Sequence, residues 1–380
     1  MEIVTNMNKI KKYGLISYYG ILHLLTIITS IIFVANTTGM NMPLAFLVSG
    51  IGTLIFTLIT KGKTPLALGL SGSYVAGVIA VSSTQGVEFA VGGTLLAGAF
   101  YILFALLIKY FPKILNLFTP TILSLAILFI AFNLLPIGVN VVKLAPITGL
   151  VTFVSVLLFS QIKRTKQFSF PLGLLIGSIV HAFLYGLSPS LSSSTIEFIK
   201  PQFSVLGFTS ISIVAIAVLF EALSDSKLVS DVTDTEFKPH RIIMGNGLAT
   251  IIGALFGSSN AVTTYTESTS FLMETKWFKW QSTVLTSILL IVLALIPQVS
   301  VLISYIPIAS FGGLLLYLFS TVATYRISEL DLSNNKTFLL GVTGLGLFYI
   351  TPALSSSISP IAVAMLGLVV VNYVYNKIMK

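Results

Sequence analysis

The sequence predicts an all-α polytopic membrane protein, and three observations carry that prediction. Charged residues make up only 9% of the 380 residues, whereas a soluble domain has about 25%. Hydrophobic residues make up 55% of the chain, and they gather in apolar runs that recur from Leu15 to Tyr375. Such a chain cannot cover a water-facing surface, which excludes a soluble enzyme and makes the lipid bilayer its expected solvent.

The apolar runs divide into fourteen predicted membrane segments, several of them short. They lie near residues 15–35, 43–60, 64–83, 89–110, 117–135, 145–162, 170–187, 205–224, 241–256, 258–275, 280–297, 299–325, 337–350 and 357–376. The basic residues test this division, because cytoplasmic loops collect Lys and Arg. With the N-terminus inside, 19 of the 21 basic residues fall on the inner side, and only Lys143 and Lys200 fall outside. The predicted topology therefore has both termini in the cytoplasm of a multi-pass protein of the cell membrane.

The connections between these segments are short and carry no soluble domain. Three lysines, Lys9, Lys11 and Lys12, precede the first apolar run, which is longer than a signal-peptide core and lacks a cleavage site. Residues 188–204 form a predicted serine-rich outer loop, and residues 226–239 and 328–336 form predicted inner loops. The net charge of +9 comes from basic residues in such loops, so it indicates topology determinants and not a nucleic-acid partner.

The third and tenth segments are unlike the others. Residues 63–74 open with Thr64-Pro65 and then carry Gly and Ser, ending in Ser71-Gly72-Ser73-Tyr74. Residues 257–267 are likewise polar and poor in helix formers, and they include Thr264 and Tyr265. Irregular backbone at membrane depth is tolerated only where it is buried in protein or lines a cavity, although Gly and Ser also permit close helix packing.

These two segments occupy corresponding positions in the two halves of the chain. Tyr74 and Tyr265 lie 191 positions apart, and Pro120 and Pro307, each near the start of a segment, lie 187 apart. Seven segments per half is an odd number, so the second half must be inverted relative to the first. Paired, interrupted segments of this kind point to a transporter binding site.

Two acidic residues, Glu221 and Glu267, lie at membrane depth. A carboxylate there costs about 2.5 kcal/mol or more, so it is expected to face a cavity and to have a function. Asp225 follows Glu221 by four residues and shares its helix face, which gives a pair able to carry a proton. The alternative for Asp225 is a structural ion pair with Lys227 at the inner end of the helix.

His23 stands inside the first apolar run, 198 positions before Glu221, and is either functional or a packing residue. His181 has no polar neighbour in the sequence, and a structural role is expected for it. The sequence contains no metal constellation, no nucleophile–base pair, no phosphate loop and no cysteine, so neither a cofactor nor enzymatic catalysis is expected.

Several stretches of the sequence resemble those of a known protein family. Leu22-His23, the run from Ser49-Gly50-Ile51-Gly52-Thr53 to Thr64-Pro65, and Gly69 to Tyr74 are similar to the first half of uracil permeases. Glu221 stands at the acidic position of the family's substrate helix, and Glu267 opens a stretch with the spacing of the family signature, ending in Thr275-Lys276. The chain thus resembles the nucleobase–cation symporter-2, or nucleobase–ascorbate transporter, family.

The resemblance implies a core domain and a gate domain, with short antiparallel strands in segments three and ten. The core would comprise residues 1–110 (segments 1–4) and 205–298 (segments 8–11), and the gate residues 111–204 (segments 5–7) and 299–380 (segments 12–14). The substrate would lie between the strands. Family members are usually proton-coupled and often homodimeric.

The resemblance also implies the residues of the site. Glu221 and Glu267 would accept hydrogen bonds from the ring N–H groups of the base, with the main chain at Tyr74 and the segment residues Ser71, Ser73, Thr264 and Tyr265 beside it. His23 and Asp225 would belong to the polar network around them. Glu267, Asp225 and His23 are therefore the expected proton-coupling residues.

Four positions depart from the family pattern. Leu22, Asp225, Ser268 and Ser270 stand where Gln, His, Asn and Gly are usual, and Val262 to Ser268 looks more like adenine/guanine/hypoxanthine permeases. The choice of base therefore does not follow from the sequence, with uracil or xanthine favoured and another purine next.

The expected function is proton-coupled import of a nucleobase. An anion carrier of the same architecture, similar to sulfate/bicarbonate permeases, is the first alternative, but Glu221 and Glu267 argue against it. A passive pore or a membrane receptor is the other alternative. A pore does not need buried acids beside broken segments, and the sequence shows no signalling domain.

Overall fold

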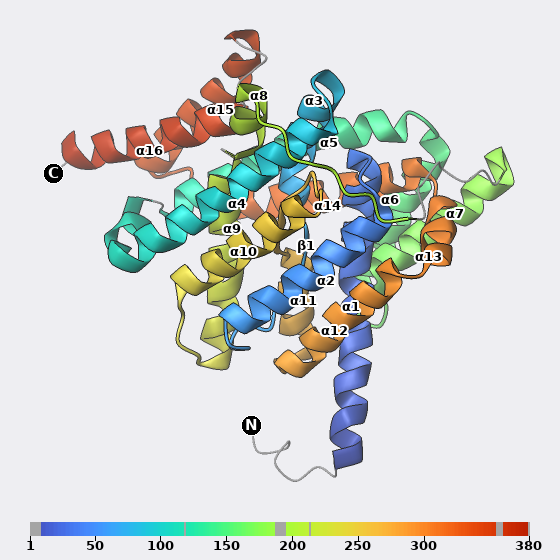
Figure 1. The fold of residues 1–380 in the computed structure, drawn as a ribbon. Helices are drawn as coiled ribbons and strands as arrows, with labels where there is room; N and C mark the ends of the chain where they lie inside the picture. The colour runs from blue at the N-terminus through green and yellow to red at the C-terminus, as the bar shows by residue number, and fades with distance from the viewer. Residues whose placement is uncertain (1–8, 118, 187–194, 213, 355–359, 379–380) are drawn as a thin grey trace.

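The computed structural model describes residues 9–117, 119–186, 195–212, 214–354 and 360–378. Within them the chain is predominantly helical (Figure 1). The first half contains α1 (Lys9–Thr38), α2 (Met42–Ile59), β1 (Leu68–Leu70), a 3-10 turn (Gly72–Tyr74), α3 (Val75–Thr84), α4 (Val87–Tyr110), α5 (Pro120–Val142), α6 (Pro146–Gln161) and α7 (Ser169–Tyr185). Short 3-10 turns at Pro112–Leu117 and Lys166–Phe168 lead into α5 and α7.

The second half likewise contains one short strand among its helices. It contains α8 (Val205–Gly207), a π-helical turn (Phe208–Ser212), α9 (Val214–Thr233), α10 (Pro239–Leu255), β2 (Val262–Thr264), α11 (Thr266–Thr275), α12 (Trp280–Ala294), α13 (Pro297–Ser304), α14 (Ile308–Ser328), α15 (Asn335–Leu354) and α16 (Pro360–Ile378). Proline opens several helices, including α5, α6 and α10, because its missing N–H is one that a first helical turn leaves unpaired anyway.

β1 and β2 pair with each other as antiparallel strands, as expected for segments three and ten. Leu68 lies opposite Thr264, Gly69 opposite Thr263 and Leu70 opposite Val262. All six residues are buried, so this short sheet lies in the interior. A Cβ at Gly69 would lie 2.2 Å from Cε2 of Tyr265, so only glycine allows the two segments to approach this closely.

Threonine hydroxyls hold the two strands in the same way in each half. Oγ1 of Thr53, on α2, accepts from the Leu68 N–H at 2.9 Å and donates to the Leu68 carbonyl at 3.3 Å. Oγ1 of Thr250, on α10, accepts from the Val262 N–H at 3.2 Å and donates to its carbonyl at 3.0 Å.

A second pair of threonines acts across the two halves. Thr283, on α12, donates to the carbonyl of Pro65, three residues before β1, at 2.8 Å. Thr94, on α4, donates to the carbonyl of Ser259, three residues before β2, at 2.8 Å. Each strand therefore depends on helices from both halves.

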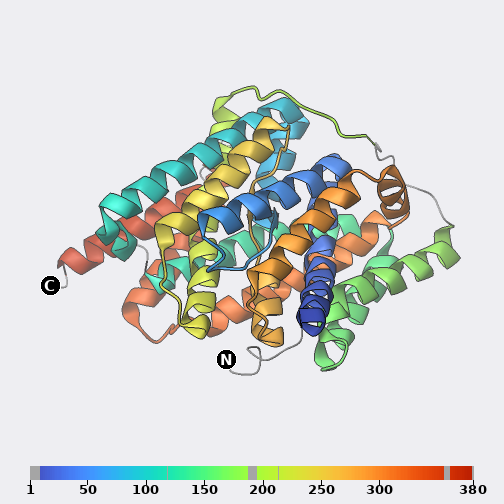
Figure 2. The same cartoon turned by 60° about the horizontal axis from the view of Figure 1, so that its bottom comes forward.

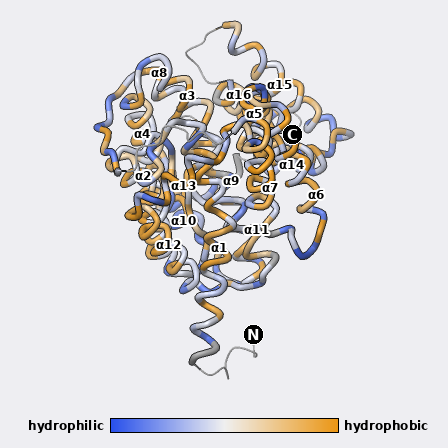
Figure 3. The backbone as a smooth tube through the Cα atoms, turned by 90° about the vertical axis from the view of Figure 1, so that its right-hand side faces the viewer, coloured by the Kyte–Doolittle hydropathy of each residue, from blue (hydrophilic) through white to orange (hydrophobic). Residues whose placement is uncertain are grey.

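The helices pack in two groups. α10 packs against α2 and α4, and α12 against α1 and α2. In Figure 2 the cyan α4, yellow α10, blue α2 and orange α12 run side by side. In the other group α14 packs against α5 and α6, α6 against α7, and α15 against α16. Figure 3 shows hydrophobic colouring along most helices and hydrophilic colouring mainly in the connections.

Seven helices of the described residues are long and apolar enough to cross a membrane, or eight if the bent pair α12–α13 is one span. The shorter apolar helices are Pro146–Gln161, Ser169–Tyr185 and Val363–Ile378. Segments three and ten are divided between a strand and a short helix, so neither qualifies by length. The structure is thus a helical membrane fold, and the count of fourteen segments stays a prediction.

Several predicted boundaries differ from the structure. The segment predicted near 299–325 is divided, because α13 ends at Ser304 and Pro307, which has no N–H to donate, precedes a new helix at Ile308. The chain also bends by 84° between α12 and α13, where Pro297 opens the second helix.

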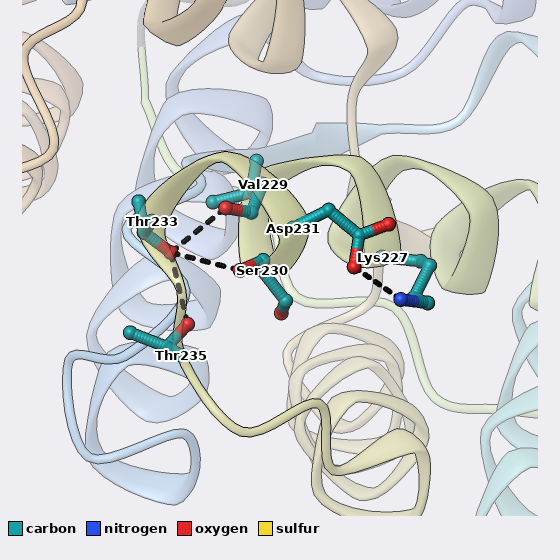
Figure 4. A network of polar contacts seen from close by, with 6 residues as sticks. All are labelled: Lys227, Val229, Ser230, Asp231, Thr233 and Thr235. Atoms are coloured by element: carbon teal, nitrogen blue, oxygen red, sulfur yellow. Dashed lines mark hydrogen bonds and ion pairs between the residues drawn. The ribbon is translucent and has the colours of Figure 1, made fainter.

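The predicted inner loop 226–239 is helical for its first eight residues, since α9 continues to Thr233. Figure 4 shows the polar contacts of this extension. Lys227 pairs with Asp231 one turn on, and the Thr233 hydroxyl donates to the Val229 carbonyl at 2.8 Å. Residues 187–194 of the predicted outer loop lie outside the described part of the chain.

Candidate functional site

A cavity of about 310 Å³ lies between the two groups of helices. One wall comes from α1, from the ends of β1 and β2, and from α9 and α11. The other wall comes from α14, from the start of α7 and from the turn before it. Six of the residues expected in the binding site line this cavity: Ser71, Ser73, Glu221, Thr264, Tyr265 and Glu267.

Glu221 and Asp225 lie on one face of α9, as their spacing predicts. Oγ1 of Thr266, the first residue of α11, is 3.3 Å from Oε1 of Glu221 and 3.2 Å from Oδ2 of Asp225. Glu221 borders the cavity, whereas Asp225 is buried and does not. The alternative pairing of Asp225 with Lys227 is not seen, because Lys227 pairs with Asp231.

Glu267 lies in the first turn of α11, directly after β2. The Ser30 hydroxyl of α1 donates a 2.7 Å hydrogen bond to Oε1 of Glu267. The amide dipoles at a helix N-terminus also favour a negative charge there. This carboxylate is therefore fixed from two sides while it borders the cavity.

The strand ends offer further polar groups. Thr264 is buried and borders the cavity, and its hydroxyl has no partner among the described residues. Its main-chain N–H donates to Oδ1 of Asn246 at 2.9 Å, which fixes the strand end from behind. The Tyr265 hydroxyl donates to the Leu70 carbonyl and so holds the end of β1.

Tyr74 and His23 lie outside the cavity wall. The fully buried Tyr74 hydroxyl is 2.8 Å from that of Tyr101 on α4, which leaves only the main chain of Tyr74 to meet a ligand. Nε2 of His23 is 2.8 Å from Oγ of Ser268, and the His23 ring stacks on Phe271 with centroids 4.4 Å apart. Ser268 also accepts from the Ala67 N–H at 2.9 Å, so His23 supports the segment before β1.

His181 has a polar partner that the sequence did not reveal. Its Nδ1 is 3.0 Å from the Thr148 hydroxyl of α6, and its ring lies against Tyr185. These contacts hold α7 against α6, in keeping with the structural role expected for this histidine.

Sequence reasoning missed the groups that reach the acids from other elements. Ser30 lies seven residues after His23 on the same helix face, a spacing that could have indicated it. Arg326 of α14 lies close enough for its charge to act on both Glu221 and Asp225. Phe319, Tyr317 and Lys166 give the cavity its second wall, and no motif identified them.

Arg326 is itself held in the last turn of α14. Its guanidinium is 2.9 Å from Oε2 of Glu329, which also accepts from the Ser124 hydroxyl of α5 at 2.8 Å. Partial burial opposes the ionised form of Glu329, but the Ser124 hydrogen bond and the Arg326 charge outweigh it and lower the pKa of this carboxyl. Within the described residues, no group of three His, Cys, Asp or Glu side chains could hold a metal ion.

The sequence is similar to those of known membrane permeases. Residues 14–351 match the family model Xan_ur_permease, described as the permease family. The uracil permease of Bacillus subtilis (strain 168) is 28% identical over 360 residues, covering 85% of this chain and 82% of that protein. The uric acid permease PucK of the same organism is 26% identical over 335 residues, covering 80% and 76%.

A solved structure shows the same fold. The transmembrane domain of the cyanobacterial bicarbonate transporter BicA matches with a TM-score of 0.68, over 94% of this chain and 96% of that one. The sequence identity in that match is 16%. This likeness concerns the arrangement of the elements and not the ligand.

Proposed function

The chain belongs to the permease family, and from that premise we propose that it imports a nucleobase by proton symport, with uracil or xanthine favoured and another purine next. It is a transporter and not an enzyme. Its relatives include uracil and uric acid permeases, which supports a planar, hydrogen-bonding base as the substrate class.

The observation that carries this proposal is the position of Glu221 and Glu267. Both border one cavity beside the strand ends, and they come from different elements. An ionised carboxylate only accepts hydrogen bonds, so two of them match the N–H groups on the edge of a base. Ser71 and Thr264, whose hydroxyl has no partner among the described residues, can meet its carbonyl groups, while Ser73 donates to Glu221.

We assign residues 1–110 and 205–298 to a core domain that carries the acids and the strands, and residues 111–204 and 299–380 to a gate domain. The two packing groups support this division, and the cavity lies between them. The matching threonine contacts of β1 and β2 support a 7+7 inverted repeat. Transport would then move the core against the gate.

The distribution of charge supports an orientation in the cytoplasmic membrane with both termini inside. Lys166, from the connection between α6 and α7, borders the cavity, and so does Ser160 at the end of α6. That connection is among the basic loops expected on the cytoplasmic side. The cavity therefore opens inward in this conformation. A homodimer remains part of the proposal on the resemblance alone.

An anion carrier is the second candidate, because the fold is shared with a bicarbonate transporter. Two carboxylates at the cavity wall would repel an anion, and Lys166 is the one Lys or Arg among the described lining residues. A passive pore is the remaining alternative, and counterflow in reconstituted vesicles distinguishes it from a carrier.

The test is uptake and thermal stabilisation with a panel of uracil, xanthine, hypoxanthine, guanine, adenine, urate, bicarbonate and sulfate. We expect one or two bases to raise the melting temperature, since a ligand that binds the folded state stabilises it. Glu221→Gln and Glu267→Gln should each weaken base binding about 10- to 100-fold, the value of a hydrogen bond to a charged group.

Asp231→Asn is the matched control, because this carboxylate lies on the same helix α9 but is exposed and paired with Lys227. It should leave base binding unchanged. Stabilisation by the anions alone would contradict the nucleobase proposal, and unchanged uptake in both glutamine variants would refute the site.

A further inference from the structure

One hydroxyl group is shared by Glu221 and Asp225 of α9. Oγ1 of Thr266 lies within hydrogen-bond distance of both carboxyl groups, at 3.3 Å from Glu221 and 3.2 Å from Asp225. The two acids differ in their surroundings, because Glu221 borders the cavity and Asp225 is only 7% exposed behind it. Thr266 thus connects an acid that a substrate can reach with one that it cannot.

The hydrogen count at this cluster favours one shared proton. A hydroxyl has one hydrogen to donate and lone pairs with which to accept. If both carboxyls were ionised, Thr266 could donate to only one, and its oxygen would face the other carboxylate at 3.2–3.3 Å as one acceptor against another. With one proton on the pair, the protonated carboxyl donates to Thr266 and Thr266 donates to the ionised one.

The neighbouring groups indicate where that proton lies. Glu221 also accepts a hydrogen bond from Ser73, whereas Thr266 is the one partner that the described residues give to Asp225. The other groups whose charge or hydroxyl acts on the pair are Arg326 of α14, Glu267 of α11, and the buried Tyr74–Tyr101 pair. Glu221 is therefore the better-supported carboxylate and Asp225 the better proton carrier.

Building on the proposed function, we propose that Thr266 relays a proton between Asp225 and Glu221. In the forward step the Asp225 O–H bond breaks as its proton moves to Thr266 Oγ1, while the Thr266 hydrogen moves to Glu221 Oε1. One proton is transferred and the net charge of the cluster is unchanged. A protonated Glu221 is a weaker acceptor for a base N–H than the carboxylate, so substrate at Glu221 favours the proton on Asp225, and departure of the substrate frees the proton to move.

An infrared pH titration of the purified full-length protein, without any substrate, tests the relay directly. At neutral pH we expect a protonated-carboxyl band that Asp225→Asn loses and Asp231→Asn keeps. Thr266→Val should keep the proton but shift both the band and its titration, because the hydrogen bond is gone, and Thr266→Ser should match the natural protein. Thr269→Val is the control on α11, since the Thr269 hydroxyl donates only to the Tyr265 carbonyl.

Uptake of radiolabelled uracil, xanthine and urate into proteoliposomes gives the second readout. Thr266→Val should lower proton-gradient-driven uptake about tenfold more than it lowers counterflow, because one charge-assisted hydrogen bond of the relay is lost. An unchanged band in Asp225→Asn, or a Thr266→Val spectrum that superimposes on the natural one, would overturn the relay. If no base is transported while the infrared result is as expected, the proposed function is wrong, but the proton shared by Asp225 and Glu221 through Thr266 is still supported.

Discussion

At the scale of single residues, hydroxyl groups from other elements contact the two acids that border the cavity: Thr266 lies beside Glu221, and Ser30 donates to Glu267. Glu221 and Glu267 were found because a carboxylate in an apolar run is costly and therefore conspicuous. Ser30 and Thr266 were not, since a hydroxyl in a helix is common and its partner lies elsewhere in the fold. Ser30 reaches an acid 237 positions away, a distance that no local spacing reveals.

Ser268 shows how a departure from the family pattern is accommodated. It stands where the family usually has Asn, and its hydroxyl contacts both His23 and the Ala67 N–H. Both contacts are buried, so this serine connects α1, α11 and the segment before β1.

We therefore predict that Ser268→Ala destabilises the protein. The change leaves two buried polar groups without a partner, at a cost of about 1–3 kcal/mol each. Thermal unfolding in detergent measures the loss. Ser270→Ala is the control, because Ser270 lies on the same helix but is exposed to the cavity. Equal melting temperatures for Ser268→Ala and Ser270→Ala would contradict the prediction.

At the scale of elements, composition indicates which stretches are not regular helix, but it does not indicate that they contain β-strands. The stretches 63–74 and 257–267 were predicted to be irregular from their Gly, Ser and Thr content, and the antiparallel pairing came only from the resemblance. Three-residue strands are too short to show alternation. Their stability comes from Thr53, Thr250, Thr94 and Thr283, which reach them from four helices.

The extension of α9 escaped prediction for a different reason. Its last residues, which include Ser226, Lys227 and Asp231, are polar, and a hydropathy pattern ends where the apolar run ends. The helix continues because the Lys227–Asp231 pair lies at helical spacing and the Thr233 hydroxyl bonds back to Val229 (Figure 4).

The threonine contacts give a prediction at this scale. Thr53→Val and Thr250→Val keep the side-chain shape but remove the acceptor for a buried strand N–H, so each should cost about 1–3 kcal/mol. Both should also weaken base binding, because the strand ends border the cavity. Thermal unfolding and binding of the stabilising base measure the two effects.

Thr57→Val is the matched control for this pair of variants. Thr57 lies one turn after Thr53 on α2, and its hydroxyl donates only to the Thr53 carbonyl of the same helix. Base binding in Thr53→Val that is as strong as in Thr57→Val would show that the contact does not position β1.

At the scale of the whole molecule, the charge pattern and the position of the cavity together predict an inward-open conformation. The loop that carries Lys166 is cytoplasmic if the 19-to-2 division of basic residues reflects the topology. The cavity borders that loop, so the acids should be reachable from the cytoplasm and not from outside.

The chain has no cysteine, so single introduced thiols report this orientation without background. Ser160→Cys places a thiol at the cavity wall, and Lys200→Cys places one on the exposed segment before α8. A membrane-impermeant thiol reagent should label Lys200→Cys in intact cells and Ser160→Cys only in inverted vesicles. The reverse pattern would invert the topology, and labelling of Ser160→Cys in intact cells would contradict the inward-open conformation.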